Sequence, residues 1–259
     1  MRQSPWWLAS LAAAALSSSA GAQATPADPT DVQARFGLGL ALDLPDRWAA
    51  AFRYQYRLVD DLARYQGSYL SAGLERGIGD HVTILANYRL ALVDRGTYHR
   101  FGLGVEGSAK VKKVKFSFRP QVQLQRQHFD NDDEFGSDDD VFLRTRAAVK
   151  LDLTKRLAVS ASVEPYFKFG AKDLVDNWRN TVGLDYRVTK RLKVEGYYIY
   201  RPDYGKSYNR TFHIVGAGME LGLKPFRKKV KAKGPKAEPG RVGSDRRRQA
   251  PPEVQPIDP

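Results

Sequence analysis

Apolar and polar residues alternate with a period of two along most of the chain. The alternation is clearest between residues 141 and 200, where two hairpins share nearly the same turn: Thr154-Lys155-Arg156-Leu157 recurs as Thr189-Lys190-Arg191-Leu192. This period is typical of strands whose two faces meet different surroundings. The runs predict strands at residues 34–44, 48–58, 65–76, 82–92, 99–111, 113–127, 141–153, 156–169, 178–188, 191–201 and 210–223.

Two kinds of connection separate these runs. Tight turns follow every second run, and the intervening loops, such as 128–140 and 170–177, are longer and rich in Asp, Gly and Asn. Strands of about ten residues joined in this way are typical of outer-membrane proteins. The predicted fold class is therefore all-β, an antiparallel up-and-down transmembrane β-barrel. Because bacterial single-chain barrels have even strand numbers, twelve strands are expected, with ten as the alternative.

A soluble β-sandwich would show similar alternation, with its apolar face turned inward. The regular hairpin order and the aromatic residues near strand ends favour the membrane barrel instead, because such residues form interfacial girdles. In strand 48–58, Phe52 and Tyr54 should therefore face lipid, opposite Arg53 and Gln55. The predicted girdle residues are Trp48, Tyr56, Tyr65, Trp178, Tyr186, Tyr198 and Tyr200.

The regions outside the strands differ in composition. Residues 1–22 combine Arg2, an apolar run and the small-residue end Ala20-Gly21-Ala22, which predicts a secretory signal peptide. Residues 23–33 contain two prolines and are interpreted as a flexible lead-in to a barrel over 34–223. Residues 224–259 carry eleven Lys or Arg and four acids, which predicts a disordered basic tail in the periplasm. The absence of cysteine from the sequence suits export.

Several segments of the barrel carry a family resemblance. They are Tyr98-His99-Arg100-Phe101, Leu143-Arg144-Thr145-Arg146, Lys150-Leu151-Asp152-Leu153, Leu157, Ser162-Val163-Glu164-Pro165-Tyr166-Phe167, Trp178-Arg179-Asn180-Thr181-Val182-Gly183-Leu184-Asp185-Tyr186 and Tyr197-Tyr198-Ile199-Tyr200-Arg201. Over residues 34–223 the chain resembles a family of uncharacterised outer-membrane barrels, domain of unknown function 2490. The resemblance implies a location in the bacterial outer membrane and no particular activity. The basic tail departs from the family pattern.

The inward-facing positions carry more basic than acidic residues, and arginine dominates the half of the barrel next to the longer loops. Arginine matches carboxylate and phosphate groups, so a small porin-like pore that attracts anionic solutes is predicted. The predicted lumen residues are Arg57, Arg89, Arg100, Arg144, Arg146, Arg179 and Arg201. The alternative is that the charges pair and fill a closed lumen. The protein would then be a structural, envelope-organising barrel whose tail tethers it to an anionic periplasmic partner.

An acidic outer loop lies within residues 128–140. Its acids are Asp130, Asp132, Asp133, Glu134, Asp138, Asp139 and Asp140. The loop could be simply solvated, could neutralise the arginines and plug the barrel, or could bind divalent cations at the lipopolysaccharide surface. It lacks the glycine of a helix-flanked calcium loop, so no metal site is predicted.

A surface lipid hydrolase is the third hypothesis, because His99 and His213 fall near outer strand ends. The sequence contains no Gly-x-Ser-x-Gly motif. We therefore predict no enzyme, no catalytic residue and no cofactor. The expected partners are membrane lipid, lipopolysaccharide and the barrel assembly machinery. Nucleic acid is not expected, since much of the net charge of +13 belongs to the tail.

Overall fold

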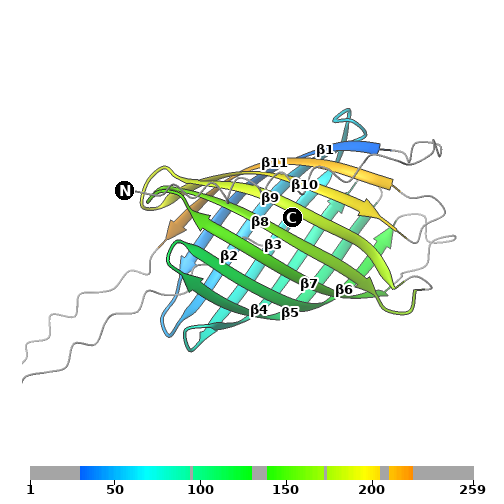
Figure 1. The fold of residues 1–259 in the computed structure, drawn as a ribbon. Coiled ribbons are helices and arrows are strands. Elements are labelled where there is room, and N and C mark those ends of the chain that lie inside the picture. Colours follow the sequence, from blue (N-terminus) through cyan, green and yellow to red (C-terminus); the bar gives the residue numbers. More distant parts are fainter. Residues whose placement is uncertain (1–29, 94–95, 130–138, 172–173, 205–209, 224–259) are drawn as a thin grey trace, which may run out of the picture.

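Eleven strands form one closed barrel in the computed structural model, which describes residues 30–93, 96–129, 139–171, 174–204 and 210–223 (Figure 1). Each strand pairs with its neighbours in sequence, and β1 also pairs with β11. The strands are β1 (Thr30–Asp43), β2 (Trp48–Val59), β3 (Arg64–Ile78), β4 (Val82–Val93), β5 (Gly96–Val111), β6 (Val114–Phe129), β7 (Asp139–Asp152), β8 (Leu157–Lys168), β9 (Val175–Arg187), β10 (Leu192–Asp203) and β11 (Arg210–Leu223).

The prediction of twelve strands, with ten as the alternative, is wrong. β1 is a full wall strand that begins at Thr30, before the expected start at residue 34. It pairs antiparallel with β2 and parallel with β11, in a register that places Thr30 opposite Thr211 and Leu42 opposite Leu223. One parallel pair allows an odd number of strands to close a sheet in which every other pair is antiparallel. Odd-stranded membrane barrels exist outside the bacterial even-number rule on which the prediction depended.

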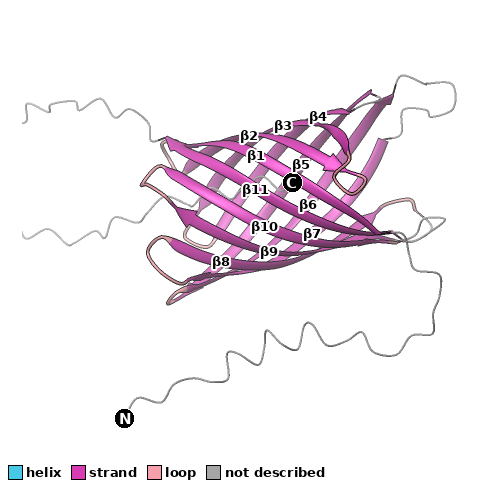
Figure 2. Cartoon of the chain, turned by 90° about the horizontal axis from the view of Figure 1, so that it is seen from above, coloured by secondary structure: helices cyan, strands magenta, loops and turns pink. Residues whose placement is uncertain are grey.

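The barrel has two distinct ends. At one end, here called the turn end, the connections are residues 44–47, 79–81, 112–113, 153–156 and 188–191. At the other, the loop end, they are 60–63, 94–95, 130–138, 169–174 and 204–209, of which the first two are as short as the turns. Because the strand number is odd, Thr30 lies at the loop end and Leu223 at the turn end (Figure 2).

Several predicted regions lie outside the described residues. They are the signal peptide, the lead-in up to residue 29, the basic tail 224–259, and Asp130, Asp132, Asp133, Glu134 and Asp138 of the acidic loop. Asp139 and Asp140 of that loop begin β7.

The repeated turn sequence has one structural explanation. The hydroxyl oxygen of Thr154 accepts hydrogen bonds from the backbone N–H groups two and three residues further on, at 3.1 and 3.0 Å. Thr189 accepts the same two bonds at the same two distances. A threonine side chain in this position satisfies amides that the tight turn leaves without a strand partner.

The barrel is polar inside and apolar outside, as the alternation predicts. In β2, Arg53, Gln55 and Arg57 are buried, whereas Phe52 and Tyr54 are 50% and 39% exposed. The same exposed apolar face continues around the barrel, for example at Phe36, Leu38, Leu70, Phe101, Leu103, Phe116, Phe118, Val122, Val182, Leu184, Val215 and Met219. Such an exterior suits contact with hydrocarbon rather than water. No helix among the described residues is long and apolar enough to span a bilayer.

Glycine at position 216 makes room for a side chain on the neighbouring strand β10. A Cβ atom built on Gly216 would overlap the ring of Tyr197, which packs against β11. From there the Tyr197 hydroxyl reaches the side chain of Gln55 on β2, whose Nε2 donates to it at 3.3 Å. The missing side chain thus allows a contact across the seam where β1 and β11 close the barrel.

The variant Gly216→Ala is expected to lower the free energy of unfolding by about 1–3 kcal/mol, because an added methyl group forces the Tyr197 ring away. Urea unfolding of the refolded barrel measures this. Gly107→Ala is the matched control, since its Cβ would meet nothing within 4 Å, and it should be neutral or slightly stabilising. Equal destabilisation by both substitutions would contradict the packing role of Gly216.

Candidate functional site

Seven arginines from seven strands converge in the lumen, and we call them the arginine cluster. They are Arg35, Arg57, Arg89, Arg100, Arg144, Arg179 and Arg201. Arg35 is only 2% exposed, and Arg57, Arg89 and Arg144 are also buried. Electrostatic interactions join members from distant strands: Arg35 with Arg179 and Arg201, and Arg89 with Arg144. Like charges from different parts of the wall therefore share one region of the lumen.

The structure brings together six of the seven arginines that the sequence analysis selected. The seventh, Arg146, lines a cavity nearer the turn end together with Arg53, Lys150 and Arg179 of the cluster. The alternation also places Arg35 inward in the half next to the loops, although it was not among the predicted pore residues, and it lies directly opposite Arg57 in the β1–β2 register.

Aromatic rings support five members of the arginine cluster. The distances from the guanidinium carbon to the ring centroid are 3.7 Å for Arg57 over Tyr69, 4.1 Å for Arg179 over Tyr166, 4.7 Å for Arg144 over Tyr166, 4.0 Å for Arg201 over Phe212 and 5.7 Å for Arg100 over Tyr98. Stacking occupies the face of a guanidinium group and leaves its N–H donors pointing outward from its edge. The rings therefore orient the cations without neutralising them.

Glutamines hold three of these arginines, and the sequence analysis did not select them. Arg57 Nε donates to Gln55 Oε1 at 2.7 Å, Arg100 Nε donates to Gln125 Oε1 at 3.1 Å, and Arg144 Nη1 donates to Gln123 Oε1 at 3.1 Å. All three glutamines alternate with the outward apolar residues, which is the only sequence signal they carry. As neutral acceptors they orient the cations without removing their charge.

Three carboxylates at this level each contact a cation at short distance. Glu164 binds Arg144 at 2.8 Å, Asp203 binds Arg201 at 2.9 Å, and Asp140 binds Lys168 at 2.7 Å. Among the described residues, neither Arg35 nor Arg57 forms an ion pair with a carboxylate. The acids of this region therefore pair with cations other than Arg35 and Arg57.

Arg35 and Arg57 also retain buried donors without acceptors. Within the described part of the chain, Arg35 Nε and Nη1 and Arg57 Nη2 have no hydrogen-bond partner. A buried charged donor without an acceptor is costly, and the cost increases when a second guanidinium lies directly across the ladder. Such groups in a native protein require an explanation, and a bound anion supplies one.

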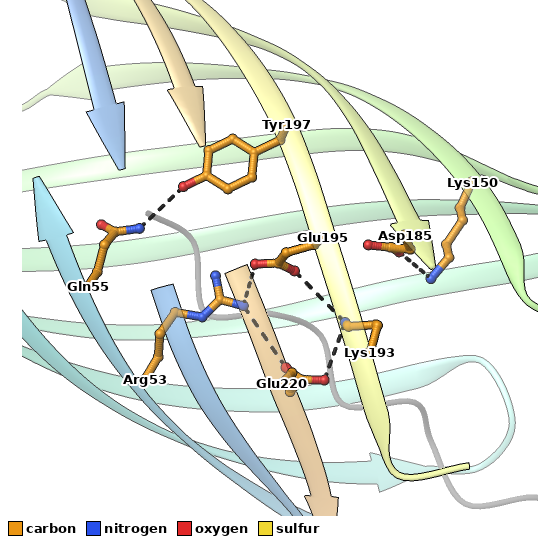
Figure 3. Close-up of polar contacts among 8 residues, drawn as sticks. All are labelled: Arg53, Gln55, Lys150, Asp185, Lys193, Glu195, Tyr197 and Glu220. Carbon is orange, nitrogen blue, oxygen red and sulfur yellow. Dashed lines mark hydrogen bonds and ion pairs between the residues drawn. The ribbon is translucent and has the colours of Figure 1, made fainter. Parts of the chain in front are cut away.

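A network of ion pairs occupies the lumen nearer the turn end (Figure 3). Arg53 Nη2 lies 2.9 Å from Glu195 Oε1, and Lys193 Nζ lies 3.3 Å from Glu220 Oε1. Cross contacts of 4.0 Å join Arg53 to Glu220 and Lys193 to Glu195. Two cations and two carboxylates therefore balance one another here, in contrast to the arginine cluster.

A cavity of about 120 Å³ lies beside this ion-pair network. Its lining contains six Lys or Arg residues and three acids, and it includes Arg179 and Tyr197 at its boundary with the arginine cluster. The volume accommodates several water molecules or a small anion. Residues of the arginine cluster and of the ion-pair network therefore line one cavity.

The two histidines considered for hydrolysis lie on the exterior of the barrel wall. His99 Nδ1 lies 2.7 Å from the Tyr88 hydroxyl, and His213 Nδ1 lies 2.6 Å from the Tyr198 hydroxyl. Both contacts join aromatic neighbours on adjacent strands, as in an interfacial girdle. In the described residues, no three His, Cys, Asp or Glu side chains are grouped as they would be around a metal ion.

Replacing Arg35 by methionine is expected to raise the free energy of unfolding by about 1–2 kcal/mol in anion-free buffer, because it removes a buried charge that lacks a counter-ion. Urea unfolding of the refolded variant tests this expectation. Arg47→Met is the control, because Arg47 is 42% exposed beside Asp80 and should change stability little. A clear loss of stability in Arg35→Met would mean that Arg35 is part of the structural filling.

Comparisons with known proteins assign the chain to a family. The family model described as "Protein of unknown function (DUF2490)" matches residues 33–211. Among solved structures, the NanC porin has a TM-score of 0.49 and 13% identity, over 74% of this chain and 99% of the porin. An anion-selective porin from Comamonas acidovorans has a TM-score of 0.34 and 14% identity, over 68% of this chain and 52% of that one.

No curated protein matches the sequence. The family match covers most of the chain and nearly the whole barrel, and the protein belongs to the DUF2490 family of proteins of unknown function.

Proposed function

We propose that this protein is an outer-membrane barrel whose lumen selects small anions, in the manner of a porin-like pore. The observation that carries the proposal is the arginine cluster, in which Arg35 and Arg57 are buried and retain donors without acceptors among the described residues. Rings of Arg or Lys are the usual selectivity elements of anion pores. The cavity beside Arg179 would continue the route toward the turn end.

The proposed orientation places the turn end in the periplasm and the loop end outside, because short turns face the periplasm in barrels of this class. The arginine cluster would then lie nearer the external mouth, and β11 would end at Leu223 on the periplasmic side. A tail beginning at residue 224 would be periplasmic in this arrangement.

Anion flux into proteoliposomes tests the proposal. Vesicles that carry the refolded barrel, internal nitrate and a chloride-quenched dye should lose fluorescence after addition of KCl much faster than protein-free vesicles, because entering chloride exchanges for nitrate. A matched vesicle with a potassium-sensitive dye should respond more slowly. A heat-modifiable band on an electrophoresis gel establishes that the barrel is folded, and a folded barrel without chloride flux would overturn the proposal.

A closed, envelope-organising barrel is the second candidate, and the ion-pair network favours it. Arg53 of β2 pairs there with Glu195 of β10 and Glu220 of β11, and Lys193 of β10 completes the network. Polar side chains fill the lumen of small barrels in this way. On this alternative, deletion of residues 224–259 would release the barrel from an anionic periplasmic partner, and substitution of lumen arginines would leave that association unchanged.

A further inference from the structure

We infer that the arginine cluster contains a binding site for a polyvalent oxyanion of the phosphate or sulfate class, centred on Arg35 and Arg57. This inference deepens the proposed function and rests on it, because the anion must reach the site through the lumen. It adds that the lumen retains such an anion at one place, in addition to attracting anions in general.

Arg57 is held in one orientation from two directions. The ring of Tyr69 covers the face of its guanidinium group at 3.7 Å, and Gln55 Oε1 accepts a hydrogen bond from its Nε at 2.7 Å. Gln55 is fixed in turn, because its Nε2 donates to the Tyr197 hydroxyl (Figure 3). These contacts leave Arg57 Nη2 without an acceptor among the described residues, and Arg57 is only 7% exposed. Donors fixed in advance bind a ligand with little loss of side-chain entropy.

Arg35 supplies the second part of the site. Its cross-strand partners are Arg57 on β2 and Gly216 on β11, and the Tyr197 ring packs over that glycine. Arg35 is therefore enclosed by Tyr197 on one side and by Arg57 on the other, and its Nε and Nη1 still lack acceptors within the described residues. An anion between Arg35 and Arg57 would satisfy buried donors from both.

The number of cations at this point selects the charge of the ligand. Arg35 interacts electrostatically with Arg57, Arg179 and Arg201, so an anion beside it lies in the combined field of several guanidinium groups. Attraction to each of them doubles when the anion carries two charges. Several oxygen acceptors around one centre can also receive bonds from more than one guanidinium, and this geometry suits phosphate and sulfate better than a halide.

Isothermal titration calorimetry on the refolded full-length barrel in micelles tests the site without requiring an open pore. Inorganic phosphate and sulfate should bind saturably in buffer that contains excess chloride, and nitrate, an oxyanion with one charge, should bind much more weakly. Arg57→Gln should weaken phosphate and sulfate binding about ten- to a hundredfold, which corresponds to one lost hydrogen bond between charged groups. Arg47→Gln removes the same charge at the exposed turn end and should leave binding unchanged.

Arg57→Lys is a second variant in case the glutamine variant does not fold. It keeps the charge and loses the planar donor set, so its affinity should fall between those of the wild type and Arg57→Gln. If the barrel conducts chloride but binds phosphate and sulfate no more tightly than nitrate, this inference is overturned and the proposed function still stands. Saturable binding of phosphate and sulfate without chloride flux would instead overturn the proposed pore and leave the proposed binding site standing. Equal weakening by Arg57→Gln and Arg47→Gln would show general charge attraction and would also overturn the site.

Discussion

The double variant Arg35→Glu/Arg57→Glu is expected to convert the barrel from anion-selective to cation-selective. It changes the charge by four units where guanidinium groups from several strands already interact across the lumen. Charges there lie in a confined space with little water to screen them, so each contributes more than it would at the surface. The ratio of chloride to potassium permeability should fall at least tenfold, or about 1.4 kcal/mol, as measured from reversal potentials in planar bilayers.

The control for this variant is Arg47→Glu/Arg64→Glu, which changes the net charge by the same amount on exposed side chains. Arg47 and Arg64 are 42% and 57% exposed, at the turn end and the loop end. Salt screens exposed charges over about 10 Å at moderate ionic strength, so the reversal potential should shift little. An equal shift in both double variants would mean that the net charge of the protein, rather than the arginine cluster, sets the selectivity.

Glu195→Gln should produce the largest loss of stability among the single substitutions considered for the lumen. Glu195 contacts Arg53 at 2.9 Å and Lys193 at 4.0 Å, and all three side chains are largely buried. Glutamine of the same shape would leave one cation of the ion-pair network without its counter-charge. Breaking a buried pair from one side costs about 3–5 kcal/mol in the free energy of unfolding, and urea titration would measure it.

Asp152→Asn is the matched substitution in an exposed pair. Asp152 binds Lys110 at 2.7 Å, but the two side chains are 40% and 56% exposed, so the loss should stay below about 1 kcal/mol. If both substitutions had the same small effect, the ion-pair network would be solvated rather than structural. The case for a lumen filled at the turn end would then fail.

The period-two alternation was enough to predict the wall of the barrel. It located every strand to within a few residues, and it identified the lipid-facing side of β2 from Phe52 and Tyr54. It could not give the strand number, because the closing contact pairs Thr30 with Thr211 and no local pattern marks that pair as parallel. Closure depends on the register of all eleven strands together.

The candidate site was predictable in composition but not in detail. Alternation shows which face a side chain occupies, so it placed the arginines in the lumen. It does not show the depth at which a tilted strand carries each residue, so it could not show that Arg146 and Arg179 line one cavity beside the ion-pair network. The contact between Gln55 and Tyr197 joins residues 142 positions apart and exists only after the barrel closes. The sequence therefore placed Gln55 in the lumen but did not show the contact through which it is held against Arg57.

Single-channel recording of the wild-type barrel in a planar bilayer, under a KCl gradient, tests the central claim most directly. Selection of anions by the arginine cluster predicts discrete conductance steps with a reversal potential displaced toward the chloride equilibrium value. A folded barrel that stays silent, or one whose reversal potential lies toward the potassium value, would contradict the claim.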